Sequence, residues 1–244
     1  MKPAIIATNL TKKYGDKTAV ENLNLAVNQG ELYSLLGVNG AGKTTTIKML
    51  SCLIKPTSGD ASLCGYSVQK EALKVKEKIN VSPQETAIAM QLSVRENLEF
   101  ISGIYGHEKT TAKDKATEVI ESLGLTAIEH SKARILSGGW QRRLSIAMAL
   151  ISDPEILFLD EPTLGLDVIA RRELWQTIES LKGRKTVILT THYLEEAESL
   201  SDQIGIMTCG RLIASGTPAE LKEQAEEENF EDAFVKLCSG GTVQ

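Results

Sequence analysis

Short apolar runs recur along the chain between polar and glycine-rich segments. Between residues 23 and 27, leucine and valine occupy every second position, a period typical of a strand with one buried face. Three short apolar runs at 32–36, 156–159 and 187–189 are bounded by polar residues. Strands that are buried on both faces have this pattern, so the runs predict a largely parallel sheet covered by helices.

Two further elements of the core are indicated by local signals. The apolar stretches 204–207 and 211–214 are separated by Thr208-Cys209-Gly210, which predicts a hairpin. The glycine-rich segment after residue 36 is followed by helix-like spacing over 44–53. Strand, glycine loop and helix in this order indicate the start of a βα unit.

The part of the chain between Gln84 and Ile151 is predicted to be mostly helical. Ser93-Val94-Arg95-Glu96 has the form of a capping box at a helix start. Helical spacing follows at 117–123 and at 142–151. A helical block between strands of an α/β core is expected to form a subdomain rather than a separate domain.

Composition places the chain among ordinary globular proteins. Its 244 residues carry 27 Lys+Arg against 32 Asp+Glu, a net charge of −5; this argues against a dedicated nucleic-acid binder. No apolar run approaches the roughly 20 residues that span a bilayer. The first residues turn polar at Thr8, too soon for a signal-peptide core. We therefore expect a chain that neither crosses a membrane nor leaves the cytoplasm.

A phosphate-binding loop is the first motif with clear chemistry. Residues 37–44, Gly-Val-Asn-Gly-Ala-Gly-Lys-Thr, match the pattern G-x-x-x-x-G-K-[ST]. Glycines let the backbone amides converge on one anion, and the following helix adds its positive end. Lys43 can bridge the β- and γ-phosphates, and the hydroxyl of Thr44 can bind Mg²⁺.

The strand at 156–159 ends in two acids, Asp160 and Glu161. Beside a phosphate loop, the first carboxylate is placed to hold Mg²⁺. The second can accept a proton from an attacking water. Taken alone, two acids before a proline are also a plain boundary between strand and turn.

A second anion-binding helix start is predicted at Leu136-Ser137-Gly138-Gly139-Trp140-Gln141. Ser137 occupies the cap position, and the two glycines expose backbone amides. In isolation this motif would indicate only a well-capped helix.

The whole set, in this order, resembles the ATP-binding subunit of ABC transporters, whose signature is the LSGG element. Four further positions match that family. Tyr14 corresponds to the aromatic residue that stacks on adenine, and Gln84 to the glutamine that senses Mg²⁺ and the lytic water. Asp167 corresponds to the aspartate loop, and His192 to the switch histidine that contacts the γ-phosphate. One departure is Trp140, where the family commonly has glutamine; it is expected to pack either on a partner subunit or inside the helical subdomain.

The resemblance implies an α/β fold with a P-loop NTPase core. This core has a mixed, largely parallel sheet, an N-terminal antiparallel β subdomain and an inserted α-helical signature subdomain. The implied division is a core over 1–85 and 152–219, a helical subdomain over 86–151 and a C-terminal helical tail over 220–244. A capping box at Thr217-Pro218-Ala219-Glu220 leads into this tail.

The resemblance also implies ATP and Mg²⁺ as ligands and assigns residues to them. The catalytic group is Glu161, His192, Gln84 and Lys43, and the Mg²⁺ group is Thr44, Gln84 and Asp160. Nucleotide contacts are assigned to Tyr14, Gly37, Asn39, Gly40, Ala41, Gly42, Lys43, Thr44, Thr45, Ser137, Gly138, Gly139 and Asp167.

The implied partners are a second ATPase chain, the same or similar, and transmembrane permease subunits at the cytoplasmic face of the membrane, with no nucleic acid. The permease is expected to contact residues 87–105. The C-terminal segment 230–235 resembles subunits of ABC-2 type exporters, which favours export.

The alternative is an ATPase of the same superfamily that acts on the ribosome or on DNA. Such proteins normally carry two cassettes or long coiled coils, and GTPases lack the LSGG element.

Overall fold

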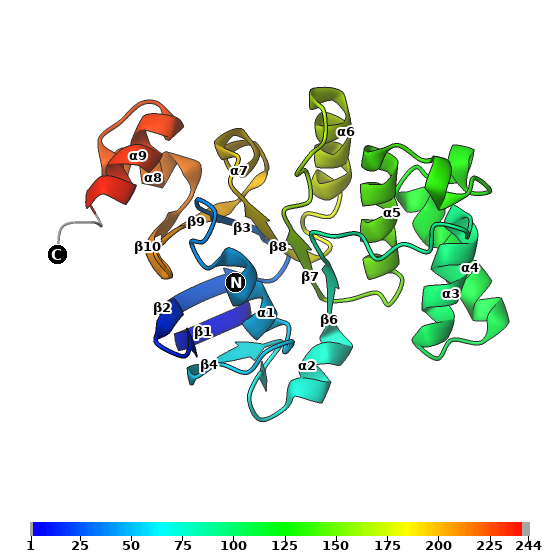
Figure 1. Cartoon of the computed structure of the whole chain (residues 1–244), viewed down its shortest axis with the longest axis horizontal. Coiled ribbons are helices and arrows are strands. Elements are labelled where there is room, and N and C mark those ends of the chain that lie inside the picture. The colour runs from blue at the N-terminus through cyan, green and yellow to red at the C-terminus, as the bar shows by residue number, and fades with distance from the viewer. Residues whose placement is uncertain (1, 241–244) are drawn as a thin grey trace.

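The computed structural model describes residues 2–240 and contains two β-sheets with helices packed around them (Figure 1). The N-terminal sheet is antiparallel, with the strand order β2-β1-β4-β5. Its strands are β1 Pro3–Tyr14, β2 Lys17–Asn28, β4 Ser58–Leu63 and β5 Tyr66–Ser67. Side chains 23, 25 and 27 are buried and those between them exposed, so the period of two predicted for this strand is confirmed.

The central sheet has the order β10-β9-β3-β8-β7-β6, and every neighbouring pair is parallel except β9 with β10. Its strands are β3 Leu32–Leu36, β6 Ile79–Ser82, β7 Ile156–Asp160, β8 Thr186–Thr191, β9 Gln203–Thr208 and β10 Arg211–Gly216. All residues of β3, β7 and β8 are buried. The predicted mixed, largely parallel sheet and the hairpin are therefore confirmed.

The central sheet is buried on both faces because its strands alternate between two cores. Phe158 and Ile188 pack into a cluster with the N-terminal sheet and α1 (Lys43–Leu50). Leu157 and Leu189 point to the opposite face, where they pack against α6 (Val168–Glu179). The remaining helices around the core are α2 Ala72–Lys78, α7 Leu194–Leu200, α8 Pro218–Ala225 and α9 Phe230–Gly240.

The helical block forms its own cluster beyond β6 and β7, drawn in green in Figure 1. It contains α3 Val94–Ile104, α4 Lys109–Ser122, α5 Gly138–Leu150 and short 3₁₀ turns at Thr126–Ile128 and Ala133–Ile135. The capping box is confirmed, since the Ser93 hydroxyl accepts from the amide of Glu96 and the Glu96 carboxylate accepts from the amide of Ser93.

One predicted helix boundary was wrong, and another was confirmed against local propensity. The helix expected over 44–53 ends at Leu50, because Cys52 adopts a left-handed conformation (φ 57°) that an α-helix cannot continue. The predicted helix start at the LSGG element is confirmed, since Ser137 is the N-cap and α5 begins at Gly138, despite the low helix propensity of glycine. Tertiary packing overrides that propensity, since a Cβ on Gly139 would lie 3.0 Å from the Cβ of Ala170 on α6.

The second predicted capping box is confirmed in the C-terminal part. Thr217 and Glu220 form the second capping box, with Pro218 in the first turn of α8. Residues 241–244 of the predicted tail lie outside the described residues. Within residues 2–240, the structure has no helix with both the length and the apolar character that a membrane span requires.

Candidate active site

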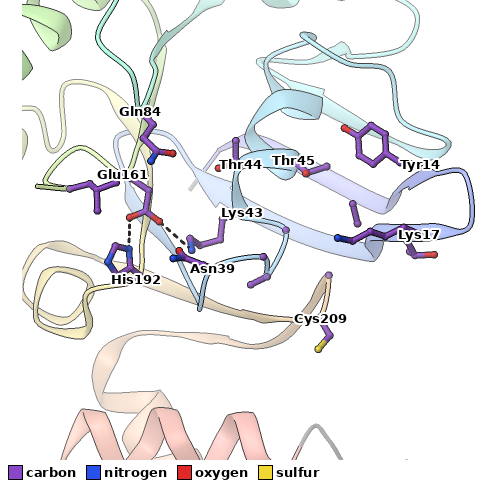
Figure 2. Close-up of a pocket in the computed structure, with 17 residues that line it drawn as sticks. Tyr14, Lys17, Asn39, Lys43, Thr44, Thr45, Gln84, Glu161, His192 and Cys209 are labelled. Atoms are coloured by element: carbon purple, nitrogen blue, oxygen red, sulfur yellow. Dashed lines mark hydrogen bonds and ion pairs between the residues drawn. The ribbon is translucent and has the colours of Figure 1, made fainter.

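A cavity of about 740 Å³ opens where β3, β8 and β7 end at their carboxyl edges (Figure 2). Ligand sites of α/β proteins lie at this edge of the sheet. Eleven of the predicted site residues line the cavity. They are Tyr14, Asn39, Gly40, Ala41, Gly42, Lys43, Thr44, Thr45, Gln84, Glu161 and His192.

The loop between β3 and α1 forms the floor of this cavity and can only be built with glycine at two points. Gly42 has φ 104°, and a Cβ there would lie 2.7 Å from the carbonyl oxygen of Ala19. A Cβ on Gly37 would lie 2.3 Å from the carbonyl oxygen of Met207. Because α1 begins at Lys43, its unpaired N-terminal amides belong to the cavity, as anion binding requires.

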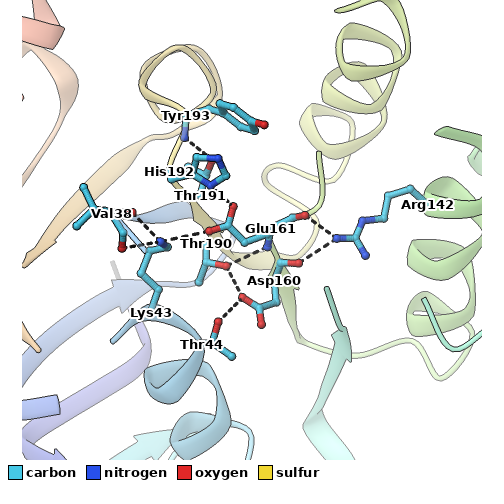
Figure 3. Close-up of polar contacts among 11 residues, drawn as sticks. Val38, Lys43, Thr44, Arg142, Asp160, Glu161, Thr190, Thr191, His192 and Tyr193 are labelled. Atoms are coloured by element: carbon cyan, nitrogen blue, oxygen red, sulfur yellow. Dashed lines mark hydrogen bonds and ion pairs between the residues drawn. The ribbon is translucent and has the colours of Figure 1, made fainter. Parts of the chain in front are cut away.

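Lys43 is buried and engaged on two sides. Its Nζ donates to the carbonyl oxygens of Gly37 (2.6 Å) and Val38 (3.3 Å). The same atom lies 3.2 Å from Oε1 of Glu161. The ammonium group is therefore held at the centre of the loop with a carboxylate as its counter-charge (Figure 3).

Glu161 stands at the junction of three elements. Its backbone is left-handed (φ 48°), which is uncommon for a residue other than glycine. Its amide donates to the Thr190 hydroxyl at 3.0 Å. Its Oε2 lies 2.7 Å from Nδ1 of His192, within hydrogen-bonding distance. The pairing of Asp160 with Thr190 in the β7–β8 register brings these groups together.

Asp160 lies beside the cavity, where Oδ1 accepts hydrogen bonds from the hydroxyls of Thr44 (3.1 Å) and Thr190 (2.6 Å). A threonine hydroxyl next to a carboxylate is the hard-oxygen donor set that Mg²⁺ prefers. The residues present thus fit a magnesium ion at this point.

Tyr14 lies at the far end of the cavity from Glu161 and His192 (Figure 2). The residue is 51% exposed, and Nζ of Lys12 lies 5.1 Å from the centroid of its ring. Gln84 lies on the wall that follows β6. One end of the cavity therefore offers an open aromatic ring, and the other a lysine, a histidine and a buried carboxylate.

The remaining predicted nucleotide contacts lie outside this cavity in the described part of the chain. Ser137, Gly138 and Gly139 form the N-terminus of α5 and pack beside α6. Asp167 caps α6, with Oδ1 accepting from the amides of residues 169 and 170 at 2.9 Å. Ser137 occupies the N-cap position, yet within residues 2–240 its hydroxyl makes no capping hydrogen bond. The predicted position of Ser137 at the cap of this helix is confirmed, and the residue is exposed.

Trp140 packs inside the helical subdomain, the second of the two expected placements. The guanidinium carbon of Arg143 lies 4.4 Å from its ring centroid. Gln141 supports the preceding loop, donating from Nε2 to the carbonyl oxygens of Ala133 and Leu136, both at 3.2 Å.

Three residues of the site's surroundings escaped the sequence analysis. The Thr190 hydroxyl donates to the carboxylate of Asp160 and accepts from the amide of Glu161. Its only signal in the sequence is that a polar residue stands at the end of an apolar strand. Arg142 donates to the carbonyl oxygens of Asp160 and Glu161 (Figure 3). Glu196 is fully buried and accepts from Nε1 of Trp175 at 3.0 Å. The last two contacts are long-range and leave no local pattern.

Fold and cavity together define a P-loop nucleoside-triphosphatase. Within that class the chain belongs to the ABC transporter family, since the model described as "ABC transporter" matches residues 20–164. The chain is 41% identical over 96% of its length to the probable multidrug ABC transporter ATP-binding protein YbhF of Escherichia coli, and spans 41% of that protein. It is 44% identical over 88% of its length to the linearmycin resistance ATP-binding protein LnrL of Bacillus subtilis, spanning 70% of it.

Solved structures agree on the fold. The structure of an ATP-binding subunit of an ABC transporter superposes with a TM-score of 0.83 at 26% identity, covering 96% of this chain and 99% of the other. The ATP-binding cassette MJ0796, solved as a dimer in a post-hydrolysis state with ADP and Pi, has a TM-score of 0.76 at 28% identity, covering 87% and 98%. The predicted fold class and family are therefore confirmed.

Proposed function

We propose that this chain is the ATP-hydrolysing motor of an ABC transporter and that it drives export through separate transmembrane subunits. The observation that carries the proposal is the triad of Lys43, Glu161 and His192, in which Lys43 and Glu161 are buried and His192 is partly exposed. The three residues follow β3, β7 and β8, which are neighbouring parallel strands of the central sheet. The chain covers less than half of the YbhF protein, so its transport role is argued from the site and not transferred whole.

In the proposed reaction, Glu161 is the general base that takes a proton from the attacking water. Its two oxygens face Lys43 and His192, which hold the carboxylate in one orientation. A γ-phosphate at the loop would draw the Lys43 ammonium to itself and release Oε1 for the water. Lys43 and His192 then stabilise charge on the transferring phosphoryl group.

Magnesium is assigned to Thr44 and Asp160, with Gln84 as a third oxygen on the wall of the cavity. When bound there, the ion would neutralise charge on the phosphate oxygens. Thr190 keeps Asp160 in place through its 2.6 Å hydrogen bond. The adenine base is assigned to the exposed ring of Tyr14, because an aromatic face stacks on any base.

The second half of each site is proposed to come from another chain. Ser137, Gly138, Gly139 and Asp167 lie outside the cavity of their own chain but at exposed or half-exposed positions. In a head-to-tail pair, each Ser137–Gly139 segment would cover the ATP held by the other chain. Two copies of this chain, or one copy with a similar ATPase chain, satisfy this geometry. In this arrangement the helical subdomain that carries Ser137–Gly139 comprises residues 86–151, and the core comprises residues 1–85 and 152–219.

The transmembrane subunit is proposed to dock on the groove beside α3. A cavity of about 200 Å³ there is lined by apolar residues that include Ala87, Ile101 and Ile104. Ile104 is 64% exposed and Phe100 on the same helix is 56% exposed. Such a patch fits an apolar partner, and docking would hold the chain at the cytoplasmic face of the membrane.

Export is supported by what the relatives are named for. The daunorubicin resistance protein DrrA3 of Streptomyces coeruleorubidus is 42% identical over 91% of this chain. A Nod factor export ATP-binding protein of Burkholderia orbicola is 44% identical over 88% of it. These names favour transport over the ribosome- or DNA-directed alternative.

The docking surface provides the test of this function. Ile104→Glu or Phe100→Glu should abolish co-purification of the transmembrane protein that the unmodified chain retains from its own cell membranes, while leaving ATP binding within about twofold. Leu73→Glu is the matched control, because Leu73 is an exposed apolar residue on α2, away from the groove. Loss of ATP binding in the α3 variants, or equal loss of the partner in the control, would contradict the proposal.

A further inference from the structure

Arg142 is a buried cation on α5 whose hydrogen-bonding capacity is completely used. A guanidinium group has five N–H donors, and this one donates to five backbone carbonyl oxygens. Nε donates to Pro162 (2.6 Å), Nη1 to Pro83 (2.5 Å) and Gln84 (3.1 Å), and Nη2 to Asp160 (3.0 Å) and Glu161 (2.6 Å).

These five carbonyls belong to two separate segments of the core. Residues 83 and 84 follow β6, whereas Asp160 is the last residue of the neighbouring strand β7 and residues 161 and 162 follow it. Both segments reach the cavity, through Gln84 on one side and Glu161 on the other. One side chain of the helical subdomain therefore fixes the backbone at the proposed base and at the proposed water-sensing glutamine.

A second contact between α5 and the core lies close to the Arg142 hydrogen bonds. One turn along the helix, the Ser145 hydroxyl lies 2.9 Å from the hydroxyl of Ser82, the last residue of β6, and both side chains are buried. Arg142 itself is only 5% exposed. Burial lowers the pKa of Arg142, while the nearby carboxylates of Asp160, Glu196 and Glu161 oppose that change. The cation is thus retained in the interior by carbonyl dipoles and by negative charge on its core-facing side.

The backbone conformation of Glu161 explains why the hydrogen bonds from Arg142 are needed. Its left-handed backbone is uncommon for a residue with a side chain, and a conformation of this kind persists only where its surroundings impose it. Here the Glu161 amide is fixed by Thr190 and its carbonyl by Arg142. The carboxylate that faces Lys43 and His192 therefore depends on a hydrogen bond from α5.

We propose that Arg142 is a positioning residue that couples the helix carrying Ser137–Gly139 to Glu161 and Gln84 of the same chain. The proposal rests on the function above, in which that helix start covers the ATP of another chain. Movement of α5 upon closure would move the backbone of residues 83–84 and 160–162 together. The α5 helix, whose N-terminus contacts the ATP of the other chain, would then align the active site of its own chain.

The test compares two adjacent arginines of α5. In Arg142→Lys the charge remains, but an ammonium has three donors and must leave at least two carbonyls unpaired. We expect kcat for ATP to fall about 10- to 100-fold through misplacement of the base, with the Kd for ATP within about twofold, because Arg142 lies outside the cavity lining of the described chain. Arg143→Lys is the control, since lysine can keep the contacts with Glu173 and Trp140.

Hydrogen exchange of the purified full chain separates positioning from loss of fold. We expect ATP and Mg²⁺ to protect 37–45, 83–85 and 160–163 in the unmodified chain; Arg142→Lys should retain the protection of 37–45 but lose that of 83–85 and 160–163. Unchanged kcat, or a parallel loss of Kd and of protection at 37–45, would overturn the proposal. If the unmodified chain neither binds nor hydrolyses ATP, the proposed function fails instead, independently of Arg142.

Discussion

His192 and Glu161 lie 2.7 Å apart, Nδ1 to Oε2, across the ends of two adjacent parallel strands. The other oxygen of the same carboxylate faces Lys43 at 3.2 Å. A carboxylate held on both sides has little freedom to turn, so its orientation is set before a substrate arrives. Preorganisation of this kind is what a general base needs.

Glu161→Gln should retain ATP binding and lose turnover. The amide has nearly the same shape but cannot take up the proton of water, so kcat should fall by about 100-fold or more. Binding without hydrolysis should leave the chain as an ATP-bound dimer in size-exclusion chromatography. Glu155→Gln is the control, because Glu155 is half-exposed and pairs with Lys78 on the surface. Normal hydrolysis by the Glu161→Gln chain would remove this residue from the base role.

Thr44→Val should separate nucleotide binding from magnesium binding. Valine keeps the shape of the side chain but removes the hydroxyl that lies 3.1 Å from Asp160. We expect the Kd for ATP in EDTA to stay within about threefold, and the apparent affinity for Mg²⁺ to fall about 10- to 100-fold. Thr44→Ser should restore it. If the valine variant titrates with Mg²⁺ as the unmodified chain does, the metal is held elsewhere.

Tyr14 offers a direct test of base stacking. Its ring is half-exposed at the mouth of the cavity, and stacking on a base contributes about 1–3 kcal/mol. Tyr14→Ala should therefore raise the Kd for ATP about tenfold in calorimetry, whereas Tyr14→Phe should leave it unchanged. Equal affinities for alanine and phenylalanine would show that adenine contacts other residues.

Much of this architecture could be predicted because it depends on local sequence patterns. The apolar runs, the glycines of 37–44 and the two capping boxes each act within a few residues. Arg142 could not be assigned, because its partners lie up to 59 residues away in the chain. The left-handed backbone of Glu161 could not be assigned either, because the groups that hold it, Arg142 and Thr190, are also distant in the chain. The start of α5 could be predicted from Ser137 in its cap position, whereas the packing of Gly139 on Ala170 could not, because Ala170 lies on another helix.

The buried carboxylate of Glu196 predicts how stability depends on pH. Burial raises the pKa of Glu196 above its ordinary value of 4.5, so the folded chain binds this proton more tightly than the unfolded chain. Stability contributed by the protonated form is then lost as pH rises above about 4.5. Glu196→Gln removes this titrating group. Between pH 4.5 and pH 8, the free energy of unfolding of the variant, measured in urea, should therefore rise relative to that of the unmodified chain. Parallel pH profiles would show that Glu196 does not carry this dependence.

The most direct test of the account is complementation between two defective chains. One chain carries Lys43→Ala and the other Ser137→Arg, each with Glu161→Gln so that hydrolysis cannot reopen a dimer. If each site is built from the loop of one chain and the α5 start of another, neither chain alone should dimerise with ATP. Their equimolar mixture should form dimers with one ATP each in analytical ultracentrifugation. A mixture that remains monomeric, while the Glu161→Gln parent dimerises, would contradict the shared site.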